Sequence, residues 1–227
     1  MSEPSQPTGP TPRAVIFDFD GTLADSYPAI TASVNQVRAS HHLPPLPEEE
    51  VRRHVGRGHR YLLEHTVPAG EPEKDLALYR AHHPSVMRSG TRLLPGAAEA
   101  LAFLHASSRL TAICSNKPKP FTRQLLAHFG LKPLIDAVLG PEDVARPKPA
   151  PDMLRAALEA LQVSADQALY VGDMTVDIET ARAAGMRVWV VPTGSDTRAA
   201  LAAAGPDRIL NGLQELPALL GGRAGGG

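Results

Sequence analysis

The stretch of sequence that decides the fold is Phe17-Asp18-Phe19-Asp20-Gly21-Thr22. The apolar run Ala14-Val15-Ile16-Phe17 leads directly into two carboxylates that are separated by one residue. A continuous apolar run is typical of a strand that is buried on both faces of a sheet. The two acids would then stand at the carboxyl end of that strand, where a metal ion or a phosphate group can reach them.

Further short apolar runs follow, at 110–114, 137–139, 168–171 and 188–191. Amphipathic helical patterns separate them, at 96–106, 119–129, 151–161 and 176–184. Strands that alternate with helices predict a parallel sheet with helices on both faces, which is a Rossmann-like α/β core. The first strand must belong to the same sheet.

The segment 28–89 is different, because it holds amphipathic stretches and no convincing β pattern. We therefore expect an all-helical insertion over residues 27–89, placed after the first strand and beside its acids. The α/β core would consist of residues 13–26 and 90–220. The Pro-, Ser-, Thr- and Gly-rich residues 1–12 should be a disordered tail, and the Gly-rich residues 221–227 a flexible one.

The composition excludes several classes of partner. The net charge is −1 and aromatic residues make up 4% of the chain, so neither a basic face nor a stacking platform for nucleic acid is expected. The single cysteine, Cys114, cannot form an intramolecular disulfide. There is no signal-peptide pattern and no apolar run of about 18 residues. We expect a cytoplasmic protein without a membrane partner, as a monomer or a homodimer.

Polar residues cluster where the predicted strands end. Ser115-Asn116-Lys117 follows the second run, and Gly172-Asp173 follows the fourth, with Asp177 one helical turn later. Lys148 lies in a Pro-rich segment before the next helix. Ligands bind at the carboxyl ends of strands in open α/β sheets, so these residues should converge on one edge with Asp18 and Asp20.

The chemistry of this cluster indicates phosphoryl transfer. Asp18, Asp20, Asp173 and Asp177 would repel one another unless a cation lay between them, and oxygen-only ligands suit Mg²⁺. Lys148 and the Ser115 hydroxyl could hold phosphoryl oxygens. One carboxylate can attack phosphorus, while a second protonates the leaving group and later activates water.

These motifs resemble those of the haloacid dehalogenase superfamily of phosphohydrolases, over residues 13–215. Asp18-Phe19-Asp20-Gly21-Thr22 resembles its first motif, Ser115 its second and Lys148 its third. The segment from Gly172-Asp173 through Asp177 resembles its fourth.

The resemblance implies a role for each residue. Asp18 would be the nucleophile that forms an aspartyl-phosphate, and Asp20 the general acid/base. Mg²⁺ would be held by Asp18, the backbone carbonyl of Asp20 and Asp173, with Asp177 next to the metal or one water away. The phosphoryl group would be bound by Ser115, Asn116 and Lys148, and Thr22 is counted with these substrate-site residues. Thr22 would orient Asp20 through its hydroxyl.

Within the superfamily, the insertion resembles the helical cap of the phosphoglycolate phosphatase-like group. Segments similar to that group are Val55-Gly56-Arg57-Gly58, Leu94-Pro95-Gly96 and Ser115-Asn116-Lys117-Pro118. The resemblance favours phosphoglycolate as substrate and leaves other small phosphomonoesters open. Arg57 departs from the small polar residue expected at its position. Arg57, a candidate substrate-binding residue, could recognise an anionic end of the substrate together with His59 and Arg60, or the three could form a solvated turn.

Three other functions remain as alternatives. A phosphosugar mutase of the β-phosphoglucomutase type shares the nucleophile, but usually has Val or Ile where Thr22 stands. A dehalogenase needs neither a metal nor a second acid, so Asp20 and Asp177 argue against it. A non-catalytic binding module is disfavoured because every expected catalytic position is filled.

Overall fold

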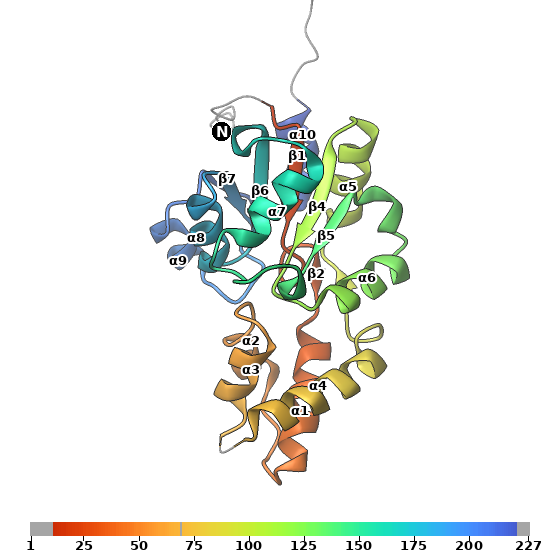
Figure 1. The fold of residues 1–227 in the computed structure, drawn as a ribbon, viewed down its shortest axis with the longest axis vertical. Helices are drawn as coiled ribbons and strands as arrows, with labels where there is room; N and C mark the ends of the chain where they lie inside the picture. The colour runs from red at the N-terminus through yellow and green to blue at the C-terminus, as the bar shows by residue number, and fades with distance from the viewer. Residues whose placement is uncertain (1–10, 69, 222–227) are drawn as a thin grey trace, which may run out of the picture.

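The computed structural model describes residues 11–68 and 70–221. Most of the two predicted tails, residues 1–10 and 222–227, therefore lies outside the described residues. The described chain forms a sheet that is flanked by helices, with a separate group of helices at one end (Figure 1). None of its helices combines the length and the apolar character that a bilayer span requires.

The predicted parallel sheet is confirmed. Six parallel strands lie in the order β5-β4-β1-β6-β7-β8, so β1 is central and pairs with β4 on one side and β6 on the other. The strands are β1 (Ala14–Phe17), β4 (Leu110–Cys114), β5 (Ala137–Leu139), β6 (Ala168–Gly172), β7 (Arg187–Val190) and β8 (Arg208–Ile209). β8 was not predicted, because two residues are too short for a pattern.

Helices cover both faces of the sheet. Alternate residues of β1 belong to different apolar clusters, Val15 and Phe17 to one and Ala14 and Ile16 to the other, as a doubly covered strand requires. The helices of the core are α5 (Ala97–Ala106), α6 (Lys119–His128), α7 (Asp152–Leu161), α8 (Thr175–Ala183), α9 (Arg198–Ala203) and α10 (Leu216–Leu220). Short 3₁₀ turns occupy Lys132–Leu134, Pro141–Asp143, Ala165–Gln167 and Leu213–Glu215.

A second group of helices follows β1, and we call residues 27–89 the cap. The chain enters and leaves the cap through a two-stranded antiparallel ribbon, β2 (Ala24–Asp25) and β3 (Arg92–Leu93), which the sequence did not predict. The cap helices are α1 (Tyr27–Ser40), α2 (Glu48–Arg52), α3 (His59–Thr66) and α4 (Pro72–Val86). They share an apolar cluster of their own and lie together below the sheet in Figure 1.

A histidine is buried where the cap meets the core. His83 of α4 is fully buried, with its ring centroid 5.2 Å from that of Tyr79 and 5.1 Å from that of Phe121 in α6. The Ser33 hydroxyl lies 2.9 Å from its Nδ1. Burial, with a smaller contribution from Lys117, lowers the pKa of His83 to about 2. The imidazole therefore stays neutral in the folded protein.

Replacing His83 with glutamine should make folding less sensitive to acid. The unfolded chain protonates this histidine near its ordinary pKa of 6.5, while the folded chain does so only near 2. Between these values the unfolded state binds more protons, so His83 lowers the free energy of unfolding by about 1.4 kcal/mol per pH unit as pH falls. Urea unfolding at about pH 7.5 and about pH 5 should show wild type losing about 1–2 kcal/mol more than His83→Gln.

The matched control is His128→Gln, which alters an exposed histidine and should leave the acid-induced loss unchanged. An equal loss in wild type and His83→Gln would contradict the account of His83.

Candidate active site

Asp18, Ser115 and Asp173 lie at one edge of the sheet, because each follows one of three neighbouring strands. Asp18 follows β1, Ser115 follows β4 and Asp173 follows β6, and these strands are adjacent and parallel. Their carboxyl ends therefore meet, as parallel strands require. Lys148 and Asp177 reach the same place from the loop before α7 and from the first turn of α8.

The Asp18 carboxylate is held from both sides. It is 3% exposed, its Oδ1 accepts a hydrogen bond from the Phe19 amide (2.7 Å), and its Oδ2 lies 2.9 Å from Lys148 Nζ. Burial raises the pKa of Asp18 to about 6; Lys148 opposes the shift and Asp177 adds to it. Additional positive charge close to Asp18 would favour the ionised form that a nucleophile needs.

Lys148 is a buried cation at the centre of the group. Its Nζ lies 2.7 Å from Asp177 Oδ1 and donates to the Tyr170 hydroxyl (3.1 Å). Burial lowers the pKa of Lys148, but Asp177 and Asp18 outweigh burial and the pKa is raised overall. The side chain therefore remains an ammonium group that can face a phosphoryl oxygen.

Asn116 fixes the backbone of Lys148. Its Oδ1 accepts from the Lys148 amide (3.1 Å), and its Nδ2 donates to the carbonyls of Lys148 and Gly56 (3.0 Å each). The resemblance assigns Asn116 to phosphoryl binding. In the structure both ends of its side chain are occupied, so that side chain positions Lys148 and contacts the cap.

Asp177 is similarly engaged. Its Oδ2 accepts from the amides of Asp173 and Met174 at 3.0 Å each, which caps the start of α8, and its Oδ1 accepts from Lys148. Asp177 is completely buried. Both carboxylate oxygens have protein partners, so this residue orients the loop that carries Asp173.

Carboxylate oxygens gather into one group that could hold a metal. Within the described residues, Asp18, Asp173 and Asp177 each offer an oxygen, and these atoms lie within 4.8 Å of one another. Asp173 Oδ2 is buried without a hydrogen-bond partner. Burial, followed by Asp177 and Asp18, raises the pKa of Asp173 well above its usual value. An unpartnered buried oxygen among acids fits a hard divalent cation such as Mg²⁺.

The role expected for Thr22 is wrong. Its hydroxyl donates to Asp173 Oδ1, at 2.5 Å, and not to Asp20. Gly21 has φ +86°, a backbone conformation that favours glycine. The chain also passes so close to Asp173 here that a Cβ at Gly21 would overlap with the Asp173 carboxylate. Thr22 therefore orients the candidate metal ligand and not the second acid.

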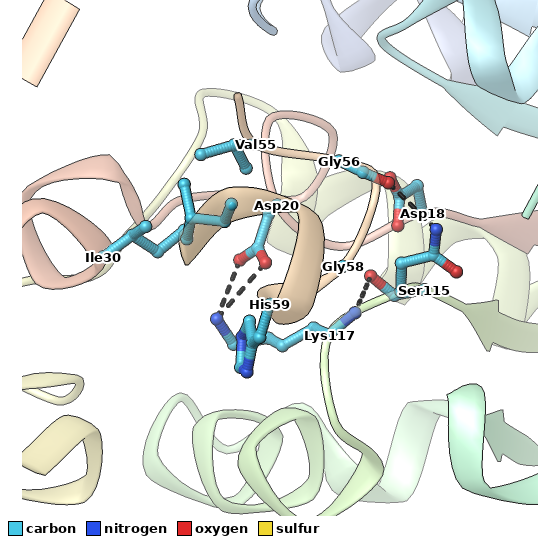
Figure 2. Close-up of a pocket in the computed structure, with 11 residues that line it drawn as sticks. Asp18, Asp20, Ile30, Val55, Gly56, Gly58, His59, Ser115 and Lys117 are labelled. Carbon is cyan, nitrogen blue, oxygen red and sulfur yellow. Dashed lines mark hydrogen bonds and ion pairs between the residues drawn. The ribbon is translucent and has the colours of Figure 1, made fainter. Parts of the chain in front are cut away.

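Asp20 is held by Lys117, a residue to which the sequence reasoning gave no role. Lys117 Nζ lies 3.1 and 3.2 Å from the two Asp20 oxygens, and its side chain is completely buried. Figure 2 shows Lys117 directed at the Asp20 carboxylate, with His59 of the cap beside it. The available signal was its place in the loop after β4, two residues beyond Ser115.

The site is a small cavity between core and cap. Core residues Asp18, Asp20 and Ser115 line it together with cap residues that include Gly56 and His59 (Figure 2). Its volume is about 20 Å³, which leaves room for about one water molecule. The cap is fastened to the core by the Asn116–Gly56 hydrogen bond and by Arg52, whose guanidinium donates to the carbonyls of Thr193 (2.6 Å) and Gly194 (2.9 Å).

The cap residue Arg57 does not line this cavity. Its side chain is exposed, and its guanidinium carbon lies 5.6 Å from the Tyr61 ring centroid. Arg57 instead lines a neighbouring groove at the boundary between cap and core.

Comparison with known proteins gives consistent results. The model of the haloacid dehalogenase-like hydrolase family matches residues 15–191. The chain is 40% identical to phosphoglycolate phosphatase of Rhodospirillum rubrum over 81% of this chain and 80% of that protein. It is 34% identical to the plasmid phosphoglycolate phosphatase of Cupriavidus necator, over 91% and 92%. The crystal structure of CbbY from Rhodobacter sphaeroides in complex with phosphate superposes with TM-score 0.78 at 25% identity, over 90% of this chain and 96% of that one.

Replacing Gly194 with alanine should weaken the binding of a divalent cation to the candidate metal group. A Cβ at this position would overlap with Asp173 Oδ2, so the carboxylate must move. Displacing a ligand in this way typically costs about 10- to 100-fold in metal affinity, which calorimetric titration with Mg²⁺ can measure. The control is Gly185→Asn, since a Cβ at Gly185 (φ +72°) meets nothing within 4 Å and asparagine tolerates the left-handed conformation. Wild-type Mg²⁺ affinity in Gly194→Ala would disprove this account.

Proposed function

The chain belongs to the haloacid dehalogenase-like hydrolase family and is a phosphoric monoester hydrolase, and we propose that it uses Mg²⁺ to hydrolyse a small phosphorylated metabolite. The favoured substrate is 2-phosphoglycolate, on the strength of the relatives from R. rubrum and C. necator. The proposed reaction passes through an aspartyl-phosphate on Asp18.

One observation carries the proposal. A buried carboxylate, Asp18, faces both a buried ammonium group and a candidate metal group, while a second carboxylate, Asp20, lines the same cavity. Asp20 is held separately by Lys117. The two acids therefore occupy different electrostatic surroundings, which suits them to different roles in catalysis.

The proposed reaction has two half-reactions. Asp18 attacks phosphorus, an oxygen–phosphorus bond forms, and the bond to the leaving oxygen breaks while Asp20 gives that oxygen its proton. Asp20 then takes a proton from water, the water oxygen attacks phosphorus, and Asp18 is released with inorganic phosphate. Lys148 and Ser115 hold the phosphoryl oxygens. Bound Mg²⁺, held by Asp18, Asp173 and the Asp20 backbone carbonyl, would supply positive charge that offsets these oxygens.

The cap would protect this chemistry from bulk water. The space of about 20 Å³ between cap and core is too small for a phosphomonoester, so the cap must move away from the core to make room for a substrate. The contacts that hold the cap, Asn116 to Gly56 and Arg52 to the loop 193–194, would then break and re-form in each turnover. Closure excludes water while the covalent bond to Asp18 forms.

The function is tested by measuring phosphate release from 2-phosphoglycolate and a panel of small phosphomonoesters. We expect turnover with Mg²⁺, loss on chelation with EDTA, and a loss of about 10³-fold or more in Asp18→Asn, since the amide cannot act as the nucleophile. The control is Asp166→Asn, which changes an exposed acid before β6, at the opposite edge of the sheet. No phosphate from any substrate, or unchanged turnover in Asp18→Asn, would refute the proposal.

The same preparation can test the mutase alternative. Incubation with β-glucose 1-phosphate and its bisphosphate should give no glucose 6-phosphate beyond a no-enzyme control. Formation of glucose 6-phosphate in place of inorganic phosphate would favour the mutase.

A further inference from the structure

A groove lies next to the catalytic cavity, at the boundary between cap and core. Its volume is about 290 Å³. It shares Gly58, His59 and Asn116 with the catalytic cavity, so the two spaces are neighbours. The cap contributes Arg57, Arg60 and Arg80 to its wall, and the core contributes prolines. The groove therefore adjoins the catalytic cavity at Gly58, His59 and Asn116.

The charge of the groove is strongly positive. None of the residues that line it is acidic, although the net charge of the whole chain is −1. Arg60 is neutralised by an ion pair with Glu73. Arg57 and Arg80 are exposed, and in the described part of the chain neither guanidinium group donates a hydrogen bond or forms an ion pair. Two positive charges thus face the groove without an acidic partner.

His59 connects the groove to the acid/base residue. Its ring lies against Tyr79, with centroids 4.4 Å apart, and it stands beside Lys117, the residue that holds Asp20. Its Nδ1 is buried without a hydrogen-bond partner. Burial, with Lys117 and Arg80, lowers the pKa of His59 to about 3, so the ring is neutral and offers a hydrogen bond rather than a charge.

These features form a path for the leaving group. In the proposed reaction Asp20 protonates the leaving oxygen, so the rest of the leaving group must start on the Asp20 side of the cavity. From Asp20 the order of residues is Lys117, His59 and then the arginines. A cavity of about 20 Å³ cannot hold the leaving group, whereas the groove can.

We propose that the groove is a subsite for a second anionic group on the substrate, a carboxylate or a second phosphate, which Arg57 and Arg80 bind. This inference rests on the proposed phosphatase function and narrows its substrates to phosphomonoesters with a charged leaving group. Guanidinium groups suit both anions, because they present paired donors to planar or tetrahedral oxygens. The competing interpretation is a solvated turn whose arginines contact water alone.

The test compares 2-phosphoglycolate with 2-hydroxyethyl phosphate, which is similar in size and has a neutral leaving group. Arg57→Met with Arg80→Met should lower kcat/KM for 2-phosphoglycolate about tenfold or more, mainly through KM, and change that of the neutral substrate less than about twofold. Ethylene glycol bisphosphate forms a third arm and shows whether the groove prefers a phosphate or a carboxylate. Arg88→Met is the control, an exposed cap arginine that does not line the groove.

Binding provides a readout that does not need turnover. In the Asp18→Asn background, calorimetry should show that Arg57→Met with Arg80→Met weakens the affinity for 2-phosphoglycolate about tenfold. The affinity for 2-hydroxyethyl phosphate should change little. Equal losses for both compounds, or no loss for either, would overturn the subsite while leaving phosphate release by the wild-type enzyme intact. Failure of the phosphatase function would show differently, as no phosphate release from any compound by wild type.

Discussion

The structure depends on neutralising a buried group of carboxylates. Lys148 Nζ lies 2.9 Å from Asp18 and 2.7 Å from Asp177, and all three side chains are almost wholly removed from solvent. Removing one partner of a buried pair typically costs about 3–5 kcal/mol, because the remaining charge is left without compensation. The loops around the site hold these side chains in place. The Asn116 side chain hydrogen-bonds the backbone of Lys148, and the amides at the start of α8 donate to Asp177.

One buried oxygen of the group has no partner within the described chain. Asp173 Oδ2 has no hydrogen-bond partner, although Gly21 and Gly194 approach this carboxylate so closely that neither position has room for a Cβ. A buried polar group without a partner costs stability, and such costs concentrate at functional sites. A divalent cation would remove this cost on binding. In the proposed reaction the cap has a separate task, since the core would supply the reacting groups and the cap would supply Arg57, His59 and Arg80.

The sequence predicted the sheet and the meeting of Asp18, Ser115 and Asp173, because apolar runs mark buried strands and parallel strands end at one edge. It missed β2, β3 and β8, which are two residues long and show no periodicity. The partners of Thr22, Asn116 and Lys117 depend on side-chain directions set by loop turns, which residue spacing does not encode. Tyr170 contacts Lys148 and Asp177. Because it lies within an apolar run, the sequence pattern marks it only as a buried strand residue.

The proposed covalent step on Asp18 is tested most directly by trapping the phosphorylated enzyme. Asp20→Asn should still accept phosphate from a ³²P-labelled compound whose leaving group needs no proton, such as 4-nitrophenyl phosphate, and should then hydrolyse the aspartyl-phosphate slowly. Acid quenching is expected to leave up to about one hydroxylamine-labile phosphate per chain, on the peptide that contains Asp18. Absence of label, or label on a different residue, would contradict the account.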